Sequence, residues 1–62
     1  MIEKRATFLT PEEVADLLKV SIYTVRRWIN QQALPAYKVG RGWRIEPTEF
    51  EGWLLENRQG TG

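Results

Sequence analysis

Two helix starts lie close together in the segment "LTPEEVADLLKVSIYTVRRWINQQ", residues 9–32. At the first start, Thr10 is an N-cap residue, Pro11 takes the first helical position and Glu13 completes a capping box. Three apolar residues then recur at helical spacing, which predicts a short amphipathic helix ending near Lys19. These residues are Val14, Leu17 and Leu18.

The second helix begins shortly afterwards, with Ser21 as its N-cap. Two helices joined so closely cannot lie antiparallel through a long loop, so we expect a steep crossing through a short turn, which is the helix-turn-helix arrangement. At about 100° per residue, one side of this helix is apolar and carries Val25, Trp28 and Ile29, with Ile22 at its margin. The opposite side displays Tyr23, Arg27 and Asn30, flanked by Thr24, Arg26 and Gln31.

Residues 37–45, "YKVGRGWRI", predict a small β-hairpin, because Pro35 ends the second helix and the glycines of "GRG" permit a turn. The first strand alternates Tyr37 and Val39 with Ala36 and Lys38. The returning strand is expected to place Trp43 and Ile45 on one face and Arg44 on the other.

A third helix begins at Pro47 and carries an apolar stripe that can close the core: Phe50, Trp53 and Leu54. The fold class is therefore mainly α with a small β-hairpin. It is a winged helix-turn-helix with three short helices and a two-stranded wing between the second and third. We expect residues 8–58 to form this domain, between flexible tails at 1–7 and 59–62.

The composition excludes several classes of function. The chain of 62 residues has no Cys and no His, which removes disulfides and the usual zinc ligands, so we expect no metal or cofactor. The acidic cluster of Glu12, Glu13 and Asp16 is explained by the dipole of the first helix, and no catalytic constellation is present, so we do not expect an enzyme. No stretch is typical of a membrane span or a signal peptide, which predicts a cytoplasmic location without membrane association.

Charge is strongly segregated along the chain. The segment 19–45 has a local charge of +6, because it contains six basic residues and no acidic one. The remainder carries three basic and eight acidic residues, a net charge of −5. This segregation predicts one basic face that attracts polyanions. The basic residues are Lys19, Arg26, Arg27, Lys38, Arg41 and Arg44.

The "GRG" segment has three readings. A phosphate-binding P-loop needs its glycines between a strand and a helix, whereas Gly40 and Gly42 lie between two strands. The glycines can simply permit positive φ in a turn. Beside a basic helix-turn-helix we favour a wing, with Arg41 at its tip near a DNA backbone. Trp43 is ambiguous between core filling and contact with nucleic acid.

The segment "LTPEEVADLLKVSIYTVRRWINQQALPAYKVGRGWRIEPTEFEGWL", residues 9–54, resembles the excisionase-type helix-turn-helix domain, a small winged-helix relative of the MerR regulator's DNA-binding domain. The resemblance implies that Ser21–Gln32 is the recognition helix for the major groove and that Val39–Arg44 is the wing. The chain departs from the family at two corners: Lys19 stands at a turn position that often holds Gly or Asn, and Gln32 at a helix end that often holds Gly. A left-handed helix cap without glycine costs about 1 kcal/mol.

These observations predict sequence-specific binding of double-stranded DNA, by a transcription regulator's DNA-binding domain or by an excisionase-type recombination directionality factor of a prokaryote or phage. The expected recognition-helix contacts are Ser21, Tyr23, Thr24, Arg26, Arg27 and Asn30. The expected wing contacts are Lys38, Arg41, Trp43 and Arg44.

Two alternatives remain open: an adaptor that docks an acidic protein through the basic face, and, with less support, binding to single-stranded nucleic acid or RNA. Weak self-association, cooperative binding on DNA and contact with a recombinase or another protein domain are further expected partnerships.

Overall fold

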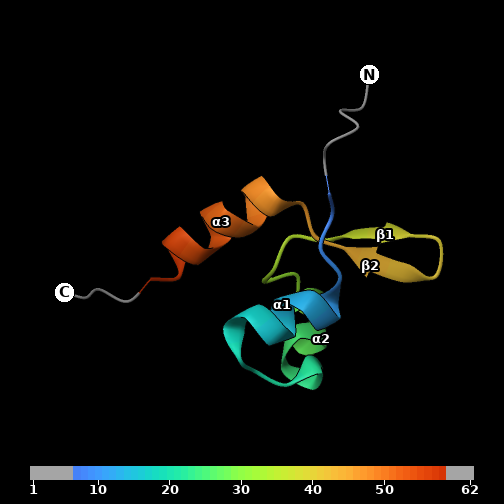
Figure 1. Cartoon of the computed structure of the whole chain (residues 1–62), viewed down its shortest axis with the longest axis horizontal. Helices are drawn as coiled ribbons and strands as arrows, with labels where there is room; N and C mark the ends of the chain where they lie inside the picture. The colour runs from blue at the N-terminus through green and yellow to red at the C-terminus, as the bar shows by residue number, and fades with distance from the viewer. Residues whose placement is uncertain (1–6, 59–62) are drawn as a thin grey trace.

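The computed structural model describes residues 7–58, and their order of elements is the one that the sequence predicts. The elements are α1 (Pro11–Leu18), α2 (Ile22–Asn30), β1 (Tyr37–Val39), β2 (Gly42–Arg44) and α3 (Pro47–Glu56) (Figure 1). The antiparallel hairpin lies between α2 and α3, so the fold is a small winged helix-turn-helix. The tails expected at 1–7 and 59–62 fall outside the described residues, apart from Thr7, which is exposed.

Both helix starts of the helix-turn-helix carry the caps that the sequence predicts. The Glu13 backbone N–H donates to Thr10 Oγ1 at 3.1 Å, and the Thr10 backbone N–H donates to Glu13 Oε1 at 2.9 Å, which completes the capping box of α1. At α2, the Thr24 backbone N–H donates to Ser21 Oγ at 3.2 Å. These bonds satisfy backbone donors that have no partner within a helix, so each start is defined by local chemistry.

Each helix of this pair is followed by a left-handed residue that is not glycine, directly after α1 and one residue beyond the cap of α2. Lys19 has φ 59° and ψ 43°, and Gln32 has φ 61°. Around Lys19, its N–H donates to the Asp16 carbonyl oxygen at 3.3 Å, and the next N–H donates to the Ala15 carbonyl oxygen at 3.0 Å. This is the Schellman arrangement, and it recurs at Gln32. The two corners therefore keep the geometry that glycine favours, although neither residue is glycine.

The core lies where α1, α2, the loop before the hairpin, the end of β2 and the start of α3 meet. The buried apolar residues are Val14, Ala15, Val25, Ile29, Leu34, Ile45 and Phe50. The apolar face expected for α2 is confirmed, with Val25 and Ile29 buried and Ile22 and Trp28 packed against the core.

The expected core stripe of α1 is wrong at Leu17, which is 61% exposed. At 100° per residue, Val14, Ala15 and Leu18 define the side that meets the core, and Leu17 lies well off that side. Ala15 is buried because the side of α1 that carries it faces the core. Because Ala15 is small, the spacing of the large apolar residues alone does not show which face of this short helix meets the core.

The tryptophans expected in the core, Trp28 and Trp53, are only half-buried. Their ring centroids lie 5.4 Å apart, and the Trp53 ring stacks on Phe50 at 6.0 Å with an interplanar angle of 18°. Leu54 is also exposed, because α3 packs on the core chiefly through its first half. The aromatic cluster therefore ties α3 to α2 at the edge of the core.

The hairpin pairs Tyr37 with Arg44, Lys38 with Trp43 and Val39 with Gly42. Of its two glycines, Gly40 alone has a positive φ, of 60°, as in a hairpin turn with glycine at the first central position. All residues of β1 are exposed, because this strand leaves the core. Beyond the hairpin, Leu9 and Ile45 exchange two backbone hydrogen bonds of 2.8 Å, which tie the N-terminal segment to the base of β2.

Candidate nucleic-acid interface

The outer face of α2 is polar, basic and open to solvent. Tyr23 is 78% exposed, and Arg26, Arg27 and Asn30 are exposed as well. Val25 and Ile29 on the opposite side are buried, so this orientation of the helix is fixed by the core. Within residues 7–58, Arg27 makes no ion pair. The guanidinium of Arg27 is therefore free to meet a partner at the middle of the helix.

A hollow of about 310 Å³ separates α2 from the hairpin and reaches the start of α1. It brings together five of the ten residues that the sequence assigns to DNA contact: Arg26, Asn30, Arg41, Trp43 and Arg44. Tyr23 and Arg27 do not line it. The helix and the hairpin thus border one concave surface, with three arginines around it.

Ser21 and Thr24, two further predicted contact residues, take part in the cap of α2. Ser21 Oγ accepts the Thr24 N–H and lies 3.1 Å from Thr24 Oγ1. This cap accounts for both residue types at the helix start without a ligand.

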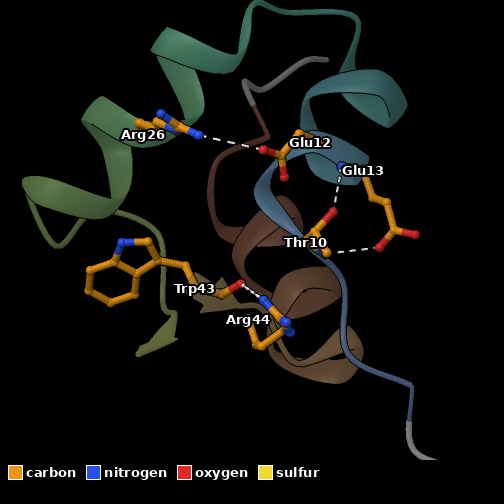
Figure 2. Close-up of polar contacts among 6 residues, drawn as sticks. All are labelled: Thr10, Glu12, Glu13, Arg26, Trp43 and Arg44. Carbon is orange, nitrogen blue, oxygen red and sulfur yellow. Dashed lines mark hydrogen bonds and ion pairs between the residues drawn. The ribbon is translucent and has the colours of Figure 1, made fainter. Parts of the chain in front are cut away.

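An acidic side chain enters the basic face from α1. Glu12 Oε2 lies 3.5 Å from Arg26 Nη2 and lines the same hollow (Figure 2). The segment 19–45 has no acidic residue in sequence, but the fold supplies one to it. Sequence reasoning assigned Glu12 to the helix dipole and missed this contact, because the pair depends on how α1 and α2 cross.

The hairpin residues differ in how they are held. Lys38 Nζ lies 5.4 Å from the centroid of the Trp43 ring, which places the ammonium over the aromatic face. Trp43 is half-buried and also lines a second hollow, of about 370 Å³, beside the end of α2. Arg44 Nη1 donates to the Trp43 carbonyl oxygen at 2.8 Å, so this guanidinium is folded back on its own strand (Figure 2). Arg41 is exposed at the turn.

The base of the hairpin is attached to α3 through Tyr37. The Tyr37 hydroxyl donates to Glu49 Oε2 at 2.9 Å, and its ring meets Phe8 edge-to-face with centroids 6.4 Å apart. The hydrogen bond to Glu49, together with the negative charge of that carboxylate, raises the pKa of Tyr37. These contacts hold the hairpin at its base and leave the turn free to approach a ligand.

Comparison with known proteins places this geometry in a family. Residues 8–58 match the family described as helix-turn-helix domain. The chain belongs to this helix-turn-helix family. Its members bind DNA, so DNA is the partner of this domain. In this helix-turn-helix domain, α1 and α2 are the two helices of the motif, and the hairpin follows them.

The helix-turn-helix domain is similar to a longer protein of Bacillus subtilis (strain 168), "Uncharacterized protein YvgK". The two sequences are 50% identical over 49 residues, which are 79% of this chain and 16% of the relative. The chain thus spans about a sixth of the length of that relative. No solved structure matches it significantly.

Two other kinds of site are missing from the part of the chain that the structure describes. Among residues 7–58, no group of three or more His, Cys, Asp or Glu side chains is placed to hold a metal ion. Over the same residues, no helix has the length and hydropathy that a membrane crossing requires.

Proposed function

We propose that this helix-turn-helix domain binds double-stranded DNA at specific sequences, with α2 in the major groove and the hairpin against the neighbouring backbone. The observation that carries the proposal is the shared concave surface between them. Arg26 and Asn30 of α2 border the same hollow as Arg41 and Arg44 of the hairpin. A duplex that lies across the opening of this hollow touches both elements at once.

The chemistry of α2 is suited to reading bases. A helix with its side chains is about 10–12 Å wide, which fits a major groove about 12 Å wide. Arginine grips guanine through two hydrogen bonds, and asparagine does the same with adenine. Tyr23 and Arg27 are exposed on this face of α2, and Asn30 lines the hollow beside the hairpin. We therefore assign base contacts to Arg27 and Asn30.

The chemistry of the hairpin is suited to holding phosphate. Arg41 is exposed at a two-residue turn, where no side chain of the described residues fixes its guanidinium. A mobile cation serves a phosphate better than a fixed pattern of base acceptors. We give Trp43 a supporting role, because Lys38 Nζ lies over its ring and the residue lines both hollows.

Selection of bound sequences from a random duplex library tests the proposal. The selected duplex should bind at least 1000-fold more tightly than a scrambled duplex, in the usual range of specific DNA-binding proteins of about 10³–10⁷. Single-stranded DNA and heparin should compete poorly for the selected site. Equal competition by heparin would favour the acidic-protein adaptor, and preference for the single strand would contradict the duplex assignment.

The biological role that we propose is a transcription regulator or an excisionase-type recombination directionality factor. Both need a domain that recognises a short duplex site, and the fold serves either. Once a site is known, its position discriminates the roles. A site in a promoter that changes transcription supports the regulator. A site beside a recombination junction, with stimulation of excision by a recombinase, supports the directionality factor.

A further inference from the structure

The hollow between α2 and the hairpin contains one carboxylate among three arginines. Glu12, at the second position of α1, lines it together with Arg26, Arg41 and Arg44. Its Oε2 faces Arg26 Nη2 at 3.5 Å (Figure 2). An acidic group on a surface that would meet DNA phosphates opposes binding, so its presence there requires an explanation.

Stability does not explain this carboxylate. The capping bonds of α1 come from Thr10 and Glu13, and Glu12 takes no part in them. The side chains of Arg26 and Glu12 are 57% and 65% exposed. Exposed ion pairs of this kind contribute little to folding, because water and salt screen them. An acidic residue in the first turn favours the helix dipole, but Glu13 already supplies one.

We propose that Glu12 is a positioning residue that makes DNA binding more selective, and this inference rests on the proposed function. Glu12 occupies the Arg26 guanidinium and repels phosphates that enter the hollow. On an unrelated duplex, only phosphate contacts are available, so the carboxylate opposes binding without compensation. On the specific site, base contacts seat α2, and Glu12 holds Arg26 toward the groove. Selectivity then comes from a repulsive element as well as an attractive one.

The test variant is Glu12→Gln, and the chain offers a matched control in the next residue. Glu13→Gln removes the same charge from the same helix turn. Its carbonyl oxygen can still accept the Thr10 N–H of the capping box, and residue 13 does not line the hollow. Both variants are measured on the selected and scrambled duplexes at several salt concentrations, and circular dichroism melting confirms that both remain folded.

Glu12→Gln should bind the scrambled duplex about fivefold more tightly, the factor that one surface charge contributes at close range. Its affinity for the selected duplex should rise less than twofold. The ratio of the affinity for the selected duplex to the affinity for the scrambled duplex should therefore fall. On the scrambled duplex, the slope of log K against log salt should grow in magnitude by about 0.9, because the released Arg26 neutralises one more phosphate. Glu13→Gln should change neither the ratio nor the slope.

A double variant isolates the part played by Arg26. In an Arg26→Gln background, Glu12→Gln should no longer change the slope. A slope change that persists there would overturn the positioning role, as would a Glu13→Gln effect equal to that of Glu12→Gln. If the wild-type domain binds duplex DNA selectively but Glu12→Gln leaves the ratio unchanged, this inference fails while the proposed function stands. A wild-type domain that shows no preference for any duplex sequence rejects the proposed function itself.

Discussion

Replacement of Gln32 by glycine should stabilise the domain, whereas the same replacement at Gln31 should destabilise it. Gln32 has φ 61°, in the left-handed region, and Gln31 has φ −84° and ψ 0°. The two residues are adjacent, identical and exposed. The pair therefore isolates backbone conformation from side-chain contacts and charge.

The magnitude follows from two opposing contributions. A left-handed conformation costs a non-glycine residue about 1–2 kcal/mol, which glycine at position 32 relieves. Glycine also loses about 0.5–1 kcal/mol more backbone entropy on folding than other residues. Gln32→Gly should therefore raise the free energy of unfolding by about 0.5–1 kcal/mol. Gln31→Gly has the entropy loss alone and should lower that free energy by about 0.5–1 kcal/mol.

Thermal melting followed by circular dichroism measures this difference directly. In a domain of this size, 1 kcal/mol shifts Tm by about 4–8 °C, so the two variants should melt on opposite sides of the wild type. The backbone hydrogen bonds of the Schellman motif persist in both variants, because neither change removes an N–H. If Gln32→Gly melts at or below the temperature of Gln31→Gly, the left-handed cap is not the strained corner that we describe.

Two further predictions concern the aromatic contacts. Trp53→Ala should lower the free energy of unfolding by about 3 kcal/mol, because it removes the ring that stacks on Phe50 and contacts Trp28. In so small a domain, each kcal/mol shifts Tm by ~4–8 °C, so a Tm within about 2 °C of the wild type would contradict this packing. In an absorbance titration of phenolate, Tyr37 should deprotonate above the ordinary tyrosine pKa, and Glu49→Gln should move it back. Because the pKa of Tyr37 is raised in the folded state, the stability that this contact adds is present below the ordinary tyrosine pKa. That stability is lost as pH rises through the folded-state pKa. If the Tyr37 titration in Glu49→Gln is the same as in the wild type, the contact does not exist.

Local chemistry made much of this fold predictable from sequence. Thr10, Ser21 and Pro47 mark helix starts through capping oxygens and a preset φ, and these signals need no knowledge of the rest of the chain. The glycines of the hairpin turn act in the same local way, although Gly40 alone takes a positive φ. The resemblance to the family also marked Lys19 and Gln32 as corners, and both are left-handed.

Features that depend on packing between elements were not predictable in this way. Leu34 is 1% exposed in an irregular segment, where no periodicity marks a core position. Leu17 was misplaced because the contact between α1 and α2 selects the rotation of α1. The pairing of Glu12 with Arg26 arises from the same contact. The sequence predicted the basic residues of the candidate interface, whereas the crossing of α1 and α2 places the acidic Glu12 among them.

The central claim is that α2 reads bases while the hairpin holds the backbone, and the binding of Arg27→Ala and Arg41→Ala across a range of salt concentrations tests it most directly. On the selected duplex, Arg27→Ala should lose about 1–3 kcal/mol and relax the preference at one base position, with little change on a scrambled duplex. Arg41→Ala should weaken both duplexes alike and reduce the magnitude of the slope of log K against log salt by about 0.9. If Arg27→Ala weakens both duplexes equally, α2 does not read sequence. If Arg41→Ala leaves affinity and slope unchanged, the hairpin is only a turn and not a wing.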